Sequence, residues 1–69
     1  MTKTLREIRE KRKLTLAEVA REVGTDAGNL SRIETGSQVP SRDLARGLYA
    51  FYDGKVSLAA IYDPGAQIA

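Results

Sequence analysis

Several side chains that usually carry catalysis or bind metals are missing from this sequence, and their absence limits its chemistry. The 69 residues include no His and no Cys, which removes imidazole acid–base chemistry, thiol chemistry, disulfides and the usual zinc ligands. The carboxylates recur at ordinary helix-surface spacing, and no glycine-rich loop of the phosphate-binding kind is present. We therefore expect no enzyme activity, no metal site and no cofactor.

Basic side chains are the remaining chemical signal, and they are unevenly distributed. The formal net charge is only +2, from 11 Lys and Arg against 9 Asp and Glu. Most of the basic residues lie in the first half of the chain, namely Arg6, Arg9, Lys11, Arg12, Lys13, Arg21 and Arg32. This clustering is compatible with a nucleic-acid partner. A solvated face, or a basic run that complements the end of a helix dipole, explains the same residues.

Three helices are expected in the first half of the chain, each opened by a side-chain oxygen that can cap the first turn. Two of the caps have a Glu three residues later, which is the spacing of a capping box. Glycines after the second and third helices provide a permissive backbone for a helix stop. The predicted helices cover about residues 5–13 after Thr4 with Glu7, the segment from Thr15 with Glu18 to Gly24, and the segment from Asp26 to about Thr35 before Gly36.

Two further helices are expected after the polar linker around Pro40. The fourth has apolar residues at the i, i+4 and i+7 positions of one face, and the fifth is short and capped by a serine. Leu44, Leu48 and Phe51 belong to the fourth helix, which should end near Gly54, while Ser57 caps the fifth, which contains Leu58 and Ile61 and stops at Pro64 and Gly65.

The pattern as a whole predicts a compact all-α fold of five helices. Strand patterns and internal repeats are absent, and residues 1–69 are expected to form one domain with a frayed tail from about residue 64. No apolar run approaches the roughly 18 residues of a membrane span, and no signal peptide is evident. The lack of Cys fits a reducing setting, so a cytoplasmic protein is expected.

Residues 14–40 read LTLAEVAREVGTDAGNLSRIETGSQVP, and they describe two helices that meet at a steep angle. Ala20 permits close helix approach and Gly24 permits the turn, while Leu30 and Ile33 anchor the second helix in the core. The opposite side of that second helix is then free to enter a groove. The major groove of DNA, about 12 Å wide, admits one α-helix.

This segment resembles the helix-turn-helix domains of the Cro and lambda-repressor type, the XRE family. The shared pattern reads LT-x-x-E-V-A, then G, then L-S-R-I-E-x-G, then P-S, and the resemblance covers nearly the whole chain. It implies a transcriptional regulator that binds double-stranded DNA sequence-specifically, most often as a repressor that sits as a homodimer on a palindromic operator. The second and third helices would form the helix-turn-helix.

The resemblance makes the third helix the recognition helix, whose first residues face base edges. An Asn amide can pair with adenine and an Arg fork with guanine, so Asn29 is the leading specificity residue, whereas Arg32 contacts either a base or a phosphate. The expected base-reading residues are Ala27, Gly28, Asn29, Ser31 and Arg32.

Two positions depart from the family pattern. Leu16 and Ala27 stand where glutamines commonly begin the second and third helices. By the family geometry the two residues lie near each other, and we hypothesise that they form an apolar patch against a thymine methyl group. An operator sequence borrowed from relatives is therefore a poor guide to this chain.

The remaining assignments concern the DNA backbone and the fold. Free N–H groups at the start of the second helix and polar groups of the linker should contact phosphates. Arg9 and Glu34 match family positions that form a partly buried ion pair. The expected phosphate contacts are Arg12, Lys13, Thr15, Leu16, Gln38, Ser41 and Arg42.

A two-fold dimer also needs a self-complementary apolar patch. The candidates for it are Tyr52, Val56, Leu58, Ile61 and Tyr62. Two other functions remain open at this point because relatives of the fold perform them. One is an antitoxin that binds a protein toxin and represses its own operon, and the other is a controller protein of a restriction-modification system.

Overall fold

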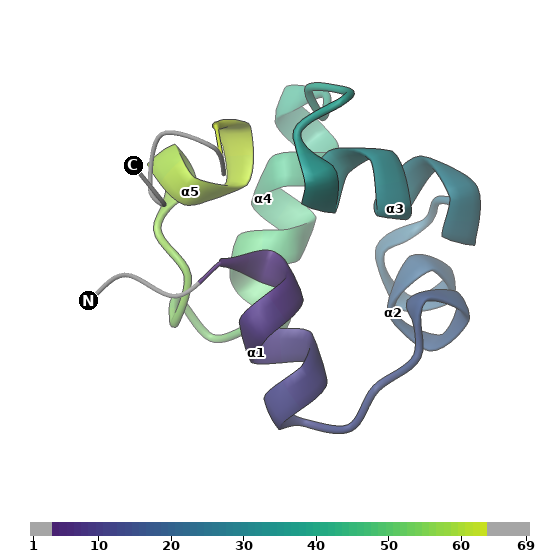
Figure 1. The fold of residues 1–69 in the computed structure, drawn as a ribbon. Coiled ribbons are helices and arrows are strands. Elements are labelled where there is room, and N and C mark those ends of the chain that lie inside the picture. The colour runs from purple at the N-terminus through teal and green to yellow at the C-terminus, as the bar shows by residue number, and fades with distance from the viewer. Residues whose placement is uncertain (1–3, 64–69) are drawn as a thin grey trace.

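The computed structural model describes residues 4–63, which contain five short α-helices joined by turns and loops (Figure 1). The described residues contain no strand, so the predicted all-α fold of five helices is confirmed. Pro64, Gly65 and the predicted tail lie outside the described residues. The helices are α1 (Leu5–Lys11), α2 (Leu16–Val23), α3 (Ala27–Thr35), α4 (Arg42–Phe51) and α5 (Leu58–Tyr62).

Side-chain caps fix where each helix begins. In every case the cap oxygen accepts a hydrogen bond from the backbone N–H three residues later, at 2.7–3.2 Å. In α1 and α2 the Glu at that third position also accepts from the cap's own N–H, so both predicted capping boxes are present. The five caps are Thr4, Thr15, Asp26, Ser41 and Ser57.

The first helix ends two residues earlier than expected, at Lys11 instead of Lys13. Lys13 adopts the left-handed conformation with φ of 58°. Its N–H donates to the Glu10 carbonyl at 3.0 Å, and the Leu14 N–H donates to the Arg9 carbonyl at 3.1 Å. This pair of bonds is a Schellman motif, which usually places glycine at the left-handed position. The motif turns the chain toward α2.

The fourth helix also ends early, at Phe51 instead of near Gly54. Asp53 and Gly54 are both left-handed, with φ of 54° and 72°. Two consecutive left-handed residues cannot continue a right-handed helix. The chain therefore reverses at the end of α4 and leads into the segment before α5.

The core lies around α4, which runs between α5 on one side and α2 and α3 on the other (Figure 1). Leu5 and Ile8 of α1 pack into this core together with Val19 and Ala20 of α2 and the anchors Leu30 and Ile33 of α3. None of the helices within residues 4–63 is long and apolar enough to cross a membrane.

Three of the five residues proposed for a dimer patch belong to this core. Tyr52, Val56 and Ile61 are 0% exposed, so the prediction that they form a surface patch was wrong. The segment after α4 folds back over the bundle and needs apolar side chains to seal it. Leu58 and Tyr62 remain exposed, at 45% and 38%.

Candidate nucleic-acid interface

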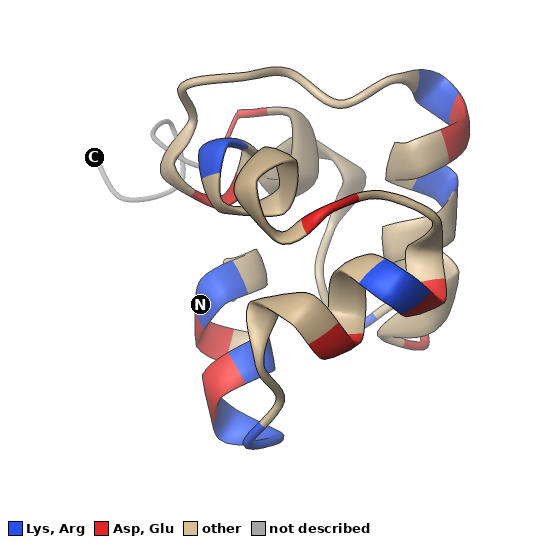
Figure 2. Cartoon of the chain, turned by 90° about the vertical axis from the view of Figure 1, so that its right-hand side faces the viewer, with Lys and Arg blue, Asp and Glu red and all other residues tan. Residues whose placement is uncertain are grey.

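The helices α2 and α3 cross steeply around a three-residue turn. α2 is seen nearly end-on in Figure 1 and α3 nearly end-on in Figure 2. Gly24 ends α2 in the left-handed conformation with φ of 84°. The Thr25 N–H then donates to the Ala20 carbonyl at 2.8 Å and closes the turn. The crossing lets Leu30 and Ile33 fill the core while another side of α3 faces outward.

The five expected base-reading residues all lie on α3, but they are not equally accessible. Gly28 and Arg32 are exposed, whereas Ala27, Asn29 and Ser31 are half-buried. The residues Gly28 and Arg32 are four apart, so they are neighbours on one side of the helix. The accessible part of α3 is therefore the strip that contains these two residues.

Asn29, the leading specificity residue, is turned toward the rest of the protein. Its amide Nδ2 donates to the Thr25 hydroxyl at 2.8 Å. One amide N–H is thus engaged in the helix-turn-helix itself, which leaves the other N–H and the amide oxygen for a base. The pairing of Asn29 with adenine stays a prediction. Around the amide lies an open pocket of about 350 Å³, lined by Val23, Gly24, Thr25, Asn29, Ser41, Asp43 and Leu44.

Arg32 is held by the loop between α3 and α4. Its Nε donates to the Gln38 side-chain oxygen at 3.1 Å. The Gln38 backbone N–H donates in return to the Arg32 carbonyl at 3.2 Å. Gln38, which the sequence assigned to a phosphate, here supports an arginine of α3 with both its backbone and its side chain.

At the start of α2 the structure changes one assignment. The Thr15 N–H donates to the Glu18 carboxylate at 2.9 Å, and the Thr15 hydroxyl accepts from the Glu18 N–H. These hydrogen bonds to Thr15 lower the pKa of Glu18. The expectation of a free N–H at Thr15 was therefore wrong, because the capping box occupies it. The N–H groups of Leu16 and Ala17 lie in the first turn, where a helix offers no acceptor.

The basic candidates for phosphate contacts differ in whether another side chain of the protein already binds them. Lys13 is exposed in the turn after α1, and Arg42 is exposed at the start of α4. Arg12 forms an ion pair with Asp53 at 3.5 Å. The Arg12 guanidinium also lies 5.5 Å from the centre of the Tyr52 ring, a cation–π contact. A phosphate would have to compete with Asp53 for Arg12.

Leu16 and Ser41 have structural contacts as well. Leu16 is half-buried against the core. The Ser41 hydroxyl accepts from the Leu44 N–H at 3.2 Å as the cap of α4. The patch of Leu16 with Ala27 against a thymine methyl group stays a prediction.

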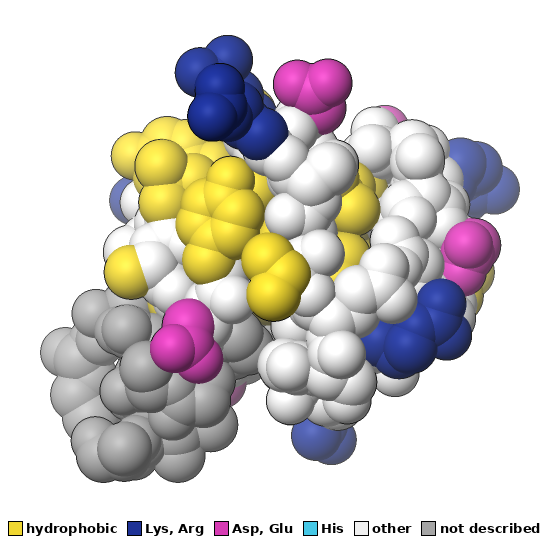
Figure 3. Space-filling model, turned by 90° about the horizontal axis from the view of Figure 1, so that it is seen from above, with side chains coloured by type: hydrophobic (Ala, Val, Ile, Leu, Met, Phe, Trp, Pro, Cys, Tyr) yellow, Lys and Arg dark blue, Asp and Glu magenta, His cyan; other side chains and the backbone are white. Residues whose placement is uncertain are grey.

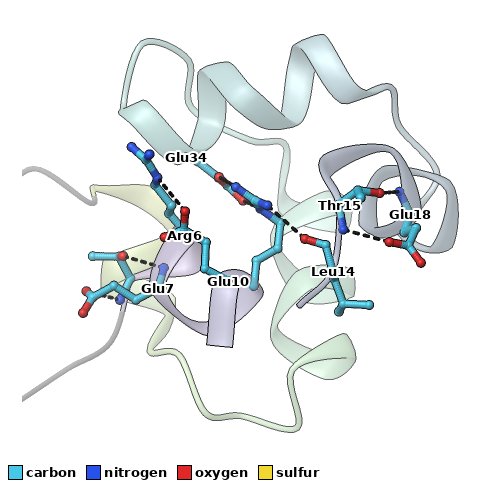
Figure 4. A network of polar contacts seen from close by, with 9 residues as sticks. Arg6, Glu7, Glu10, Leu14, Thr15, Glu18 and Glu34 are labelled. Carbon is cyan, nitrogen blue, oxygen red and sulfur yellow. Dashed lines mark hydrogen bonds and ion pairs between the residues drawn. The ribbon is translucent and has the colours of Figure 1, made fainter. Parts of the chain in front are cut away.

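Arg9 and Glu34 form a bidentate ion pair between α1 and α3 (Figure 4). Nε and Nη2 of Arg9 donate to the two carboxylate oxygens at 2.8 and 3.1 Å. Nη1 donates to the Leu14 carbonyl at 3.0 Å. The side chains are only 13% and 4% exposed, and the hydrogen bond to Glu34 raises the pKa of Arg9. The pair connects the first helix to the end of α3.

Thr25 and Asp53 were not singled out from the sequence, although each orients a candidate residue. Thr25 lies four residues before Asn29, and its hydroxyl accepts from the Asn29 amide. Asp53 is distant from Arg12 in sequence, and a left-handed turn brings it near. The spacing of Thr25 could have indicated its role, whereas nothing local in the sequence indicates that of Asp53.

Comparison with known proteins adds one match. A family model described as a helix-turn-helix domain matches residues 1–60, which include α1 to α4 and the first part of α5. No curated protein and no solved structure matches the chain significantly.

Proposed function

This chain belongs to the helix-turn-helix domain family, and from that premise we propose that it is a transcriptional regulator of the Cro and lambda-repressor type. It binds double-stranded DNA sequence-specifically, acts as a repressor in the cytoplasm, and catalyses no reaction. The observation that carries the proposal is the outward strip of α3, where exposed Gly28 and Arg32 lie opposite the buried anchors Leu30 and Ile33.

In this proposal α3 enters the major groove and the start of α2 contacts the backbone. The free N–H groups of Leu16 and Ala17, with the positive end of the α2 dipole, suit a phosphate. Lys13, in the turn after α1, and Arg42, at the start of α4, can contact further phosphates. Figure 2 shows basic residues at both the lower left and the upper right of the face that carries α2 and α3. Binding should therefore weaken steeply as salt increases.

The operator is proposed to be palindromic and bound by two copies of the chain. Exposed Leu58 and Tyr62 on α5 are the part of the predicted dimer patch that remains on the surface. Seen from above, hydrophobic side chains gather on the side where α5 lies (Figure 3). Two copies related by a two-fold axis would place their α3 helices in successive major grooves, about 34–36 Å apart.

Selection of bound duplexes from a random DNA pool at physiological salt tests this function. The expected result is a site made of two inverted half-sites, with one helical turn between their centres. Titration at increasing salt should lower the affinity for all duplexes while the preference for the selected site remains. The absence of any sequence preference at every salt concentration would refute the proposal, and a single asymmetric site would refute the dimer.

A further inference from the structure

We propose that Arg32 reads a guanine, with Gln38 holding its guanidinium in position and Gly28 leaving room for it. The inference rests on the proposed function and names the base that the outward strip of α3 recognises. Three observations carry it: the bonds between Arg32 and Gln38, the space above Gly28, and the two nitrogens of Arg32 that remain free.

Gln38 restricts Arg32 through two bonds of its own. The side-chain oxygen accepts from Nε at 3.1 Å, and the backbone N–H donates to the Arg32 carbonyl at 3.2 Å. The same carbonyl accepts from the Ser37 N–H at 2.9 Å. The hydroxyl groups of Thr35 and Ser37 lie 3.1 Å apart and are hydrogen-bonded. The loop after α3 is thus tied to the helix at several points, so the guanidinium is ordered before any DNA arrives.

Arg32 lies beside Gly28. A Cβ atom at this position would be in ordinary contact with Nη1 of Arg32, at 3.5 Å, and in tight contact with Oδ1 of Asp26, at 3.3 Å, so only atoms beyond Cβ would compete with the guanidinium for this space. The arginine therefore points back along α3, toward the start of the helix. That end is the one that reaches deepest into a major groove in helix-turn-helix complexes. A long side chain at Gly28 would displace the guanidinium.

The two terminal nitrogens of Arg32 that have no partner among the described residues match the hydrogen-bond acceptors of guanine. Within residues 4–63 no hydrogen bond or ion pair engages Nη1 or Nη2. These nitrogens form the end-on fork, which pairs with the N7 and O6 acceptors of guanine. Because the Gln38 amide is neutral, its hydrogen bond to Nε leaves the positive charge of Arg32 in place. A phosphate also accepts two such hydrogen bonds, so the test must separate base from backbone.

The test measures binding of fluorescent duplexes by anisotropy, starting from the site selected by the wild-type protein. Each half-site position carries each of the four base pairs in turn, and the proteins are wild type, Arg32→Ala, Gln38→Ala, Gly28→Leu and the control Arg42→Ala. A further duplex carries 7-deazaguanine, which lacks the N7 acceptor, at the guanine position. Arg32 and Gln38 are exposed, so their variants should fold, and circular dichroism checks this.

At one position per half-site, the wild-type protein should prefer guanine by roughly 5- to 150-fold. Arg32→Ala should abolish the guanine preference at that position alone, and the penalty for 7-deazaguanine should disappear with it, because alanine has no donor for N7 or O6. Gln38→Ala and Gly28→Leu should each weaken the guanine preference several-fold. Arg42→Ala should weaken all duplexes by a similar factor and leave the preference unchanged.

Two outcomes overturn the inference while the proposed function stands. In one, Arg32→Ala weakens all duplexes equally, which means that Arg32 contacts a phosphate. In the other, Arg32→Ala loses guanine preference but Gln38→Ala and Gly28→Leu retain it fully, which means that neither residue positions Arg32. A wild-type protein with no base preference at any position refutes the proposed function itself.

Discussion

Two arginines of this molecule use Nε to bind a side-chain oxygen, but they lie in opposite surroundings. At the junction of α1 and α3, Arg9 contacts the carboxylate of Glu34 at 2.8 Å, and both side chains are nearly inaccessible. On the outer side of α3, Arg32 contacts the amide oxygen of Gln38 at 3.1 Å, and both residues are exposed. The same donor atom therefore serves two different purposes.

The charge and burial of the partner decide the difference. A carboxylate neutralises the guanidinium, and burial makes the pair costly to break because either charge alone would be desolvated. An amide leaves the positive charge in place, and exposure leaves the other nitrogens free. The junction of α1 and α3 is thus suited to hold the fold together, whereas the outer side of α3 is suited to bind a ligand.

The largest effect on stability is expected when the carboxylate partner of Arg9 is removed. Glu34→Ala should lower the free energy of unfolding by about 3–5 kcal/mol, because it leaves Arg9 buried without a counter-charge. Urea denaturation followed by circular dichroism measures the change. The exposed pair Arg6 and Glu10, at 3.6 Å, is the matched control, and Glu10→Ala should change stability by about 0.5 kcal/mol or less. If Glu34→Ala is destabilising and Arg9→Ala is not, the pair does not stabilise the fold.

The second prediction concerns pH and the buried Tyr52, which lies near the same junction. Burial, followed by the charge of Glu34, raises the pKa of Tyr52 to about 12, whereas an unfolded tyrosine titrates near pH 10. The folded state therefore holds the proton more tightly. Its contribution to stability is complete below pH 10 and is lost as the pH rises to about 12, a loss of roughly 2–3 kcal/mol.

Tyr52→Phe isolates this effect from the titration of Lys residues. The variant should keep its stability at neutral pH, because the Tyr52 hydroxyl has no hydrogen-bond partner among the described residues. Urea denaturation at pH 8, 10 and 11 should show the difference between wild type and variant shift by about 1–1.5 kcal/mol at pH 11, roughly half of the full loss, because the pKa of folded Tyr52 lies above this range. Parallel curves for the two proteins across this range would show that Tyr52 does not titrate differently on folding.

A smaller effect is expected at Lys13, in the turn between α1 and α2. Lys13→Gly should raise the free energy of unfolding by about 0.5 to 1 kcal/mol, because glycine adopts the left-handed conformation without strain. The same change should weaken DNA binding and reduce its salt slope by about 1 if Lys13 contacts a phosphate. Thermal unfolding and salt titration are the two measurements. Lower stability in the variant would contradict the strain argument.

The smallest effect on the free energy of unfolding is expected from a substitution on the outer side of α3. Arg32→Ala should change the free energy of unfolding by less than about 0.5 kcal/mol, as is usual for exposed side chains. Its effect on binding should be much larger. Paired measurements of urea stability and DNA affinity sharpen the contrast with Glu34→Ala. A large loss of stability in Arg32→Ala would mean that its bond to Gln38 supports the loop between α3 and α4.

Much of the fold was predictable because its signals are local. The five capping residues and the left-handed glycines after α2 and α3 act within one helical turn, so the sequence alone indicates where those helices begin and end. The ends of α1 and α4 were less predictable. Lys13 and Asp53 adopt a conformation that glycine or asparagine normally signals, and only the surrounding chain requires it there.

The candidate site was predictable in its location and less so in its contacts. The spacing of Leu30 and Ile33 identified the outward side of α3. The partners of Asn29, Arg32 and Arg12 depend on side-chain directions and on how loops fold back, which periodicity does not encode. For the same reason the burial of Tyr52, Val56 and Ile61 became clear only from their packing.

The double attachment of Gln38 has a consequence for protein engineering. A designer who grafts only α3 onto another helix-turn-helix scaffold would transfer Arg32 without the loop residue that restrains it. The unit to transfer is residues 26–38, from the cap of α3 through the loop, because this segment contains the capping hydrogen bond and the hydrogen bonds between the loop and Arg32. Libraries that vary the loop at position 38 would then alter binding preferences without changing any residue of the helix.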